Sequence, residues 1–230
     1  MTGFIASSAF FGVLISLGLY QLGVFLKKKL KSGLVNPLLI AIAGTIICLL
    51  ALKVDYADYA AAAKPLSFLL TPATVCLAIP LYRQLPLMKK CWKAVVGGIL
   101  IGVVTSLVCI FALALIFGLD HAQYATLLPK SITTAIGMGV SAELGGIETI
   151  SVAVIVLTGI AGNVLAEPVC RLFRITDDVA KGIAIGTSAH AIGTARALEM
   201  GQVTGAMSGL AIAVAGIVTV VLAPVFAGFI

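Results

Sequence analysis

Three side chains that carry or can acquire a positive charge stand in stretches otherwise rich in Gly, Ser and Thr: Lys130, His190 and Arg196. A charge held at membrane depth costs about 2.5 to 3.5 kcal/mol on insertion scales, so such a residue is a functional-site candidate. Cations beside the N-termini of interrupted helices favour a small anion. These residues therefore predict a binding site for a small carboxylate.

Hydroxyl groups and glycines accompany these three cations. Hydroxyl groups can donate hydrogen bonds to a carboxylate or a neighbouring oxygen, and glycine lets the backbone approach a ligand closely. The other predicted substrate-binding residues are Thr71, Thr74, Ser131, Thr133, Thr134, Thr187, Ser188, Gly193 and Thr194. The competing interpretation is that small and hydroxyl residues serve tight helix packing, as they do in many membrane bundles.

Each cation also has a structural explanation. Lys130 follows Pro129 and could extend its ammonium group to the membrane interface. Arg196 could pair with Glu199, three residues further along a helix. His190 could be a packing residue whose hydrogen bonds are satisfied. The sequence leaves these alternatives open.

The elements that must position these residues are transmembrane helices. Hydrophobic residues make up 61% of the chain and charged residues 10%, whereas a soluble domain carries about 25% charged residues. A span needs about 20 apolar residues. Runs without an ionisable residue that approach or exceed this length occur at residues 1–26, 32–52, 65–82, 94–119, 149–166 and 200–230. We predict an all-α integral membrane protein with about six or seven transmembrane helices in a single domain over residues 1–230.

The charges between these runs predict the orientation. Residues 27–31 and 83–93 are basic, whereas the loops that hold Asp55, Asp58 and Asp120 are acidic. The positive-inside rule then places the N-terminus outside the bacterial inner membrane. The first run lacks basic residues before it, which favours a retained helix over a signal peptide. Because the net charge of +6 lies in loops, binding to nucleic acid is not expected.

The stretch 120–148 is polar and rich in Gly, Ser and Thr. If it crossed the membrane once, Arg171, Arg174 and Lys181 would lie outside, against the positive-inside rule. Non-helical backbone at membrane depth is tolerated where protein or water covers it. We therefore predict a re-entrant element at residues 127–144.

Two further segments, residues 65–82 and 182–201, are predicted to be interrupted helices, because prolines break the first and glycines and hydroxyl residues fill the second. Thr71–Thr74 aligns with Thr187–His190 at an offset of 116 residues. This alignment predicts two inverted three-segment repeats whose interrupted helices meet near the membrane midplane. The predicted order is repeat one at residues 32–119, the re-entrant element, and repeat two at residues 149–230.

Motifs for catalysis or metal binding are missing from the sequence. The five cysteines lie mostly in apolar runs without metal-ligand spacing, so they are expected to be packing residues. The sequence holds no nucleophile elbow, zinc-protease motif or Walker A loop. We expect no enzyme activity, no cofactor and no metal.

Several of these segments resemble the LrgB/CidB family, which includes antiholin-like membrane proteins and the plastid glycolate/glycerate translocator domain. The matching stretches are NPLLIAI from Asn36, TPATVCLAIPLYRQLP from Thr71, LLPKSITT from Leu127, LGGI from Leu144 and GTSAHAIGTARALE from Gly186. The resemblance implies a membrane protein that works with a small holin-like partner of the LrgA/CidA type. It also implies roles in autolysis control and in the movement of monocarboxylates such as pyruvate, glycolate or glycerate.

Two functional hypotheses follow. In the first, the chain transports small 2-oxo or 2-hydroxy monocarboxylates, linked to control of autolysis, and the three cations hold the carboxylate. In the second, it is an antiholin-like regulator of murein hydrolase export and cell lysis that acts with the holin-like partner. In both cases we expect contact with membrane lipid and a homo-oligomer, most simply a dimer.

Overall fold

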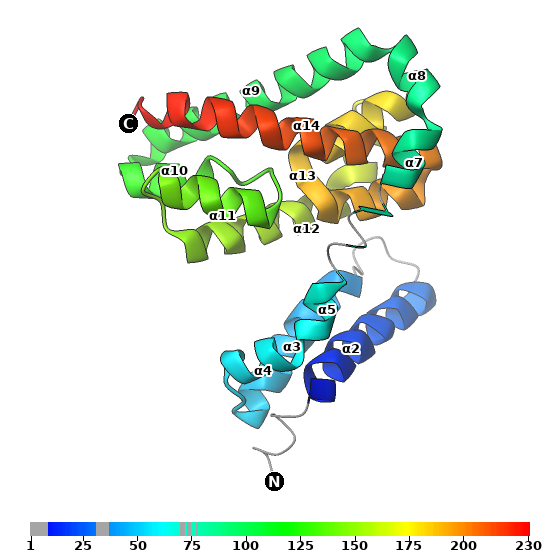
Figure 1. The fold of residues 1–230 in the computed structure, drawn as a ribbon, viewed down its shortest axis with the longest axis vertical. Coiled ribbons are helices and arrows are strands. Elements are labelled where there is room, and N and C mark those ends of the chain that lie inside the picture. The colour runs from blue at the N-terminus through cyan, green and yellow to red at the C-terminus, as the bar shows by residue number, and fades with distance from the viewer. Residues whose placement is uncertain (1–8, 31–36, 70–71, 73–74, 77) are drawn as a thin grey trace. The chain divides into compact units, whose positions relative to one another are not determined.

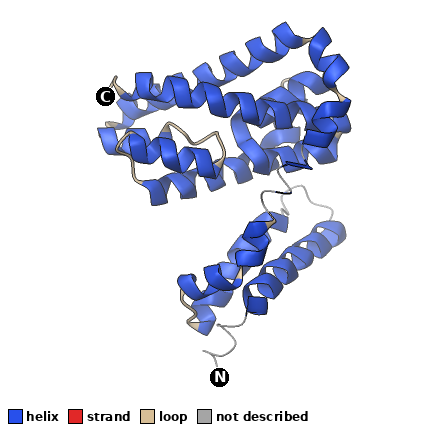
Figure 2. Ribbon diagram, viewed as in Figure 1, coloured by secondary structure: helices blue, strands red, loops and turns tan. Residues whose placement is uncertain are grey.

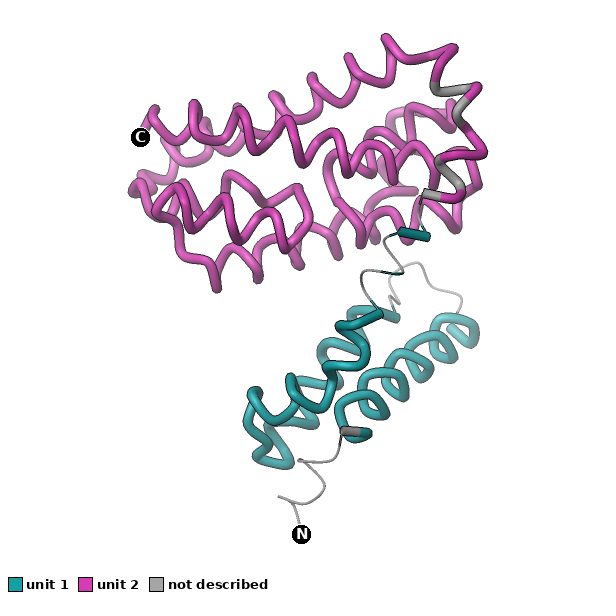
Figure 3. The backbone as a smooth tube through the Cα atoms, viewed as in Figure 1, with its two compact units in different colours: residues 1–76 teal, residues 77–230 magenta. Residues whose placement is uncertain are grey.

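The computed structural model describes residues 9–30, 37–69, 72, 75–76 and 78–230, and in this part of the chain every regular element is a helix (Figure 2). The predicted all-α class is confirmed. The chain separates into two compact units, residues 1–76 and 77–230 (Figure 3). That both units act as one transmembrane domain stays a prediction.

The first unit contains α2 (Ala9–Leu30), α3 (Pro37–Leu52), α4 (Tyr56–Ala62) and α5 (Lys64–Phe68). Helices α2 and α3 pack closely, since a Cβ atom added at Gly44 would lie 2.9 Å from the Leu19 side chain. The hydroxyl groups of Ser16 in α2 and Tyr59 in α4 lie 2.8 Å apart. These contacts hold the unit together.

The second unit contains α7 (Ala78–Arg83), α8 (Leu85–Lys90), α9 (Trp92–Phe117), α10 (His121–Leu127), α11 (Thr134–Glu143), α12 (Glu148–Leu172), α13 (Asp178–Met200) and α14 (Gln202–Ala227) (Figure 1). Among the described residues, four helices are long and apolar enough to cross a membrane: α2 from Phe10, α9, α12 and α14. The chain is therefore a membrane protein. The predicted number of spans stays a prediction, because α3 has 16 residues and α13 is broken.

The core of the second unit lies between α9 and α14. Buried residues of α9 recur every three or four positions, at Val95, Ile99, Val103, Leu107, Ile110 and Ala114, which is the spacing of one helix face. They share a cluster with Met207 and Ala211 of α14. The opposite faces expose large apolar side chains such as Ile116 and Ile217, as expected of helices that face lipid.

Helix α13 doubles back on itself at Ala189 and His190, where the backbone leaves helical geometry (His190 φ 40°, ψ −144°). A straight helix would separate Ile185 from Ala197 by about 18 Å. Both belong instead to one apolar cluster. The interruption predicted within residues 182–201 is confirmed, and it is sharp enough to make α13 a helical hairpin.

The contacts of α13 with α14 give the directions of its two arms. The first arm runs parallel to the start of α14 and the second runs antiparallel to it. In the first arm, Gly182 contacts Thr204 and Gly186 contacts Ser208, so the residue numbers of both helices rise together. In the second arm, Leu198 contacts Gly205 and Thr194 contacts Ser208, so they run in opposite order. Both ends of α13 therefore lie at the same end of the unit.

Helices α10 and α11 form another hairpin around the turn at residues 128–133; it is the first hairpin along the chain, and the α13 hairpin is the second. The two ends of the first hairpin meet. The Nε2 atom of His121, at the start of α10, is 3.0 Å from the carbonyl oxygen of Leu144, which follows α11. Both arms touch α12, where the hydroxyl of Ser151 donates to the Thr126 carbonyl at 2.9 Å and to the Ser141 hydroxyl at 2.6 Å. With seven and ten residues, neither helix could span a membrane.

These elements repeat along the second unit. Helices α9 and α12 begin at residues 92 and 148, which are 56 positions apart, and a hairpin follows each. At the same offset, Ala135-Ile136-Gly137 and Glu143 correspond to Ala191-Ile192-Gly193 and Glu199. The predicted offset of 116 is not confirmed, because Thr71 and Thr74 lie outside the described residues.

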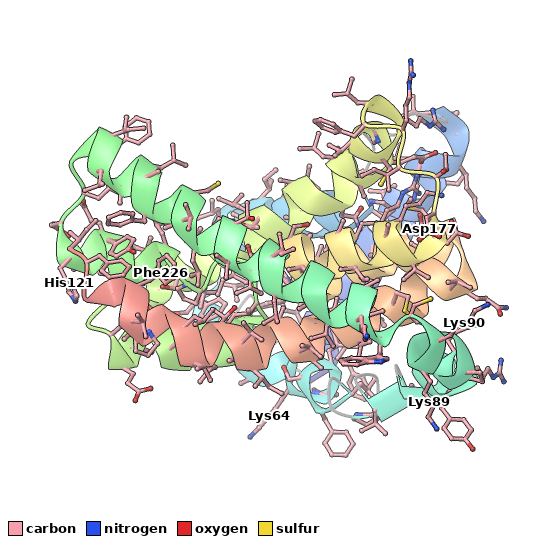
Figure 4. All side chains as sticks on the ribbon, turned by 90° about the horizontal axis from the view of Figure 1, so that it is seen from above. Lys64, Lys89, Lys90, His121, Asp177 and Phe226 are labelled. Atoms are coloured by element: carbon pink, nitrogen blue, oxygen red, sulfur yellow. The ribbon has the colours of Figure 1, made fainter. Side chains whose placement is uncertain are left out.

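The two ends of the second unit carry opposite charge. Ala94 near the start of α9 and Asp177 at the start of α13 line one pocket, so these starts share an end. Figure 4 shows Lys90 and Asp177 toward one side and His121 at the other. At the first end the basic residues Lys89, Lys90, Lys93, Arg171, Arg174, Lys181 and Arg196 outnumber the acidic residues Glu167, Asp177, Asp178 and Glu199, whereas the acidic residues at the second end are Asp120, Glu143 and Glu148.

Candidate functional site

A pocket of about 690 Å³ lies where the two hairpin turns approach α9. Lys130 and Ser131 reach it from the turn between α10 and α11, and Thr187 and Ser188 from the inner end of the first arm of α13. Helix α9 contributes Ser106. The hairpins enter from opposite ends of the unit, so residues from both hairpins meet in its interior. Four of the predicted site residues are thus brought together.

Lys130 supplies the positive charge of this pocket. Its ammonium nitrogen donates to the Ser131 hydroxyl at 3.0 Å and reaches the Ser106 hydroxyl at 3.5 Å. The two hydroxyl oxygens lie 3.3 Å apart. Among the side chains that the structure describes, no carboxylate forms an ion pair with Lys130. The turn therefore presents a cation whose polar contacts are hydroxyl groups, while the carboxylate of Asp177 that lines the same pocket caps the start of α13, and this suits an incoming anion at Lys130.

The hydroxyl groups of the second hairpin already donate within their own helix. Thr187 donates to the Ile183 carbonyl and Ser188 to the Ala184 carbonyl, each at 2.7 Å. Their oxygens remain acceptors, and each hydroxyl would have to rotate to donate to a carboxylate. Thr187 can lie this close to α9 because Gly102 has no side chain: a Cβ atom there would be 2.8 Å from Thr187 Cγ2.

Sequence reasoning predicted residues 94–119 as a transmembrane helix but missed the contribution of α9 to the site. Gly98, Gly102, Thr105, Ser106 and Cys109 all line the pocket. Gly98, Gly102, Ser106 and Cys109 follow one another at intervals of three or four residues and Thr105 directly precedes Ser106, so small and hydroxyl side chains lie on one helix face. This stripe is visible in the sequence and could have marked α9 as part of the site.

His190 lies at the turn of the second hairpin but faces away from the pocket. Its Nε2 atom is 2.9 Å from the carbonyl oxygen of Ile155 in α12, and the residue is 2% exposed. A Cβ atom at Gly159 would lie 2.6 Å from the imidazole ring. The structure thus favours the packing alternative for His190.

The remaining described residues of the predicted site have other surroundings. Thr194 shares a hydrogen bond of 2.6 Å with Ser208, and Gly193 packs beside Ala189 and Ile185. Thr133 is the N-cap residue of α11 without a side-chain cap bond, and Thr134 is the first residue of that helix. None of these four predicted residues lines the pocket around Lys130.

Arg196 lies in a different pocket, of about 810 Å³, where it donates to Glu199 at 2.5 Å and also pairs with Glu167 of α12. The alternative pairing with Glu199 is confirmed. The prediction that Lys130, His190 and Arg196 together surround one anion needs correction, because the structure brings only Lys130 to the pocket between the hairpins. Within the described residues, no cluster of His, Cys, Asp or Glu could hold a metal ion.

The chain is similar to known proteins over almost its whole length. The model of a family described as LrgB-like matches residues 16–229. The antiholin-like protein LrgB of Bacillus cereus (strain B4264) is 37% identical over 222 residues, which cover 96% of both chains. The antiholin-like protein LrgB of Bacillus anthracis (strain CDC 684 / NRRL 3495) matches with the same identity and coverage. No solved structure matches the chain significantly.

Proposed function

We propose a function for this chain from one premise: it belongs to the LrgB-like family. Relatives that match it almost from end to end bear the name antiholin-like protein. We therefore propose that it is an inner-membrane regulator of murein hydrolase export and cell lysis. In this role it acts with a holin-like partner of the LrgA/CidA type. The length of the family match is the observation that carries this proposal.

Deletion of the gene in its host tests the regulatory function. The deletion strain should lyse at an altered rate after cell-wall stress, with or without a carboxylate gradient, and the intact gene should restore the original rate. An unchanged rate of autolysis in the deletion strain would exclude this role.

A second function is supported by the pocket around Lys130. We propose that it binds a small 2-oxo or 2-hydroxy monocarboxylate of the pyruvate, glycolate or glycerate type. One ammonium group matches one carboxylate, and the hydroxyls of Ser106, Ser131, Thr187 and Ser188 can contact the oxygen on the neighbouring carbon. The names of the relatives say nothing of such a ligand, so this proposal depends on the geometry.

The arrangement of the hairpins supports transport of that anion. Inverted repeats whose interrupted helices meet near the membrane midplane are typical of secondary transporters. Here α9 and α12 are each followed by a hairpin, and the turn of the first hairpin and the inner end of the first arm of α13 line one pocket. Protein covers the turns, which is the condition under which re-entrant backbone is tolerated. We propose that both hairpins are re-entrant and that the pocket opens alternately to the two sides.

Uptake of labelled pyruvate or glycolate into proteoliposomes tests transport. The wild-type chain should take up label, Lys130→Met should lose uptake, and Lys90→Met should retain it, because Lys90 is exposed at the basic end and does not line the pocket. Equal uptake by the wild type and Lys130→Met would remove Lys130 from the mechanism. If the purified chain takes up no label and the deletion strain has a lysis defect, regulation of lysis is left as the function.

A further inference from the structure

The second pocket of this unit, at the base of the α13 hairpin, has a distinct set of charges. It is lined by the end of α12, the loop that follows, and both arms of α13. Its charged lining residues are Glu167, Arg171, Arg174, Lys181, Arg196 and Glu199. Four cations and two carboxylates thus line the pocket, and one of the cations, Lys181, pairs with Asp178 at 2.8 Å.

The two carboxylates are already paired. Glu167 accepts hydrogen bonds from Arg196 and, at 2.5 Å, from Arg171. Glu199 accepts from Arg196. Arg174 forms no ion pair with any residue that the structure describes. An anion that enters the pocket therefore meets one uncompensated guanidinium group and the hydroxyl group of Thr176 beside it.

Arg171 can leave its ion pair with Glu167 and bind the same anion as Arg174 at little cost in free energy. Its side chain is 79% exposed, and exposed ion pairs such as that with Glu167 stabilise a protein by about 1 kcal/mol at most. Two guanidinium groups present several N–H donors in planar forks, which match the oxygens of a phosphate group. The chemistry of the pocket thus favours a tetrahedral oxyanion over a neutral ligand.

The fold alone does not demand five of these six charges, as a comparison with the first hairpin shows; Glu199 is the exception, because its counterpart is Glu143. The base of the hairpin formed by α10 and α11 is built from residues 56 positions earlier in the chain. The counterparts of Glu167, Arg171, Arg174, Lys181 and Arg196 there are Phe111, Leu115, Gly118, Ala125 and Val140. An equivalent hairpin therefore forms with apolar or small residues at all five places.

We propose that this basic pocket binds a phosphate-bearing anion. It lies at the basic end of the unit, which the positive-inside rule assigns to the cytoplasm, and basic pockets between helix ends on that side suit the head groups of anionic lipids. A free phosphate group would use the same contacts. The bound anion would touch α12 and both arms of α13, so it would brace the base of the hairpin.

Thermal unfolding of the full-length protein tests this proposal and separates the two sources of phosphate. In detergent, unfolding is measured at increasing concentrations of inorganic phosphate and, as a control, of potassium chloride at the same ionic strength. The control removes the effect of charge screening by salt. In nanodiscs, phosphatidylglycerol is compared with phosphatidylcholine. The variants are Arg174→Gln, Arg174→Lys as the conservative exchange, and Lys90→Gln as an exposed cation at the same end but outside the pocket.

We expect a rise in the midpoint of unfolding for the wild type and Lys90→Gln, an affinity about tenfold lower in Arg174→Gln, and partial recovery in Arg174→Lys. Stabilisation by inorganic phosphate identifies a soluble anion as the ligand, and stabilisation only by phosphatidylglycerol identifies a lipid head group. Either result supports the pocket. No stabilisation by either probe, or equal losses in Arg174→Gln and Lys90→Gln, would overturn it.

Discussion

Lys130 shows how far a single residue could be understood from the sequence. It was singled out because a charge at membrane depth is costly, and the structure places it in a pocket with hydroxyl groups. The same reasoning grouped Arg196 with it. It could not show that Glu167, 29 residues away in the chain, lies beside Arg196, because that contact depends on how α13 folds against α12.

The glycines of the second hairpin offer a test at the residue scale. A Cβ atom at Gly186 would lie 2.8 Å from the Cα atom of Ser208 and 2.8 Å from the Cβ atom of Ala211, whereas one at Gly209 meets nothing within 4 Å. We expect Gly186→Ala to lower the free energy of unfolding by about 1 to 3 kcal/mol, the usual cost of overpacking. Gly209→Ala should be neutral or slightly stabilising. Unfolding in mixed micelles measures both, and equal stability of the two variants would show that the first arm does not pack on α14.

The ion pair between Arg196 and Glu167 predicts coupling between the second arm of α13 and α12. Both side chains are partly exposed, at 25% and 35%, so the coupling should be modest. A double-mutant cycle with Arg196→Gln and Glu167→Gln should give an interaction free energy of about 0.5 to 1 kcal/mol. Additive effects of the two exchanges would mean that this pair does not tie the hairpin to α12.

At the scale of elements, the first hairpin was easier to predict than the second. Residues 127–144 were expected to re-enter because the stretch is polar and because the basic residues after α12 needed to return to the same side. Residues 182–201 are about as long as a span, and only the break at Ala189 and His190 shows that they fold back. Both hairpins contain Ala-Ile-Gly with Glu six residues later, at an offset of 56 residues and not at the predicted offset of 116.

A distance measurement by electron paramagnetic resonance tests the fold of α13. Spin labels at Lys181→Cys and Met200→Cys, in a background without native cysteines, would be about 28 Å apart on a straight helix. Both positions line one pocket in the structure, so we expect a clearly shorter distance. A distribution centred near the straight-helix value would refute the hairpin.

At the scale of the whole molecule, the second unit has a basic end and an acidic end, and α9 and α12 run between them in opposite directions. The positive-inside rule then predicts that the basic end faces the cytoplasm. In intact cells, a membrane-impermeant maleimide should modify Glu143→Cys and leave Lys90→Cys unmodified until the membrane is permeabilised. Both positions are exposed, at opposite ends of the unit. The reverse pattern of labelling would invert the assigned orientation.

The measurement that tests the central claim most directly is equilibrium binding of labelled pyruvate or glycolate to the purified protein. If the pocket between the hairpin turns holds the carboxylate through Lys130, the wild type binds saturably and Arg196→Gln binds equally well. Lys130→Met should bind at least about tenfold more weakly, the cost of one lost charge-assisted hydrogen bond. Binding by Lys130→Met as tight as that of the wild type would contradict the account.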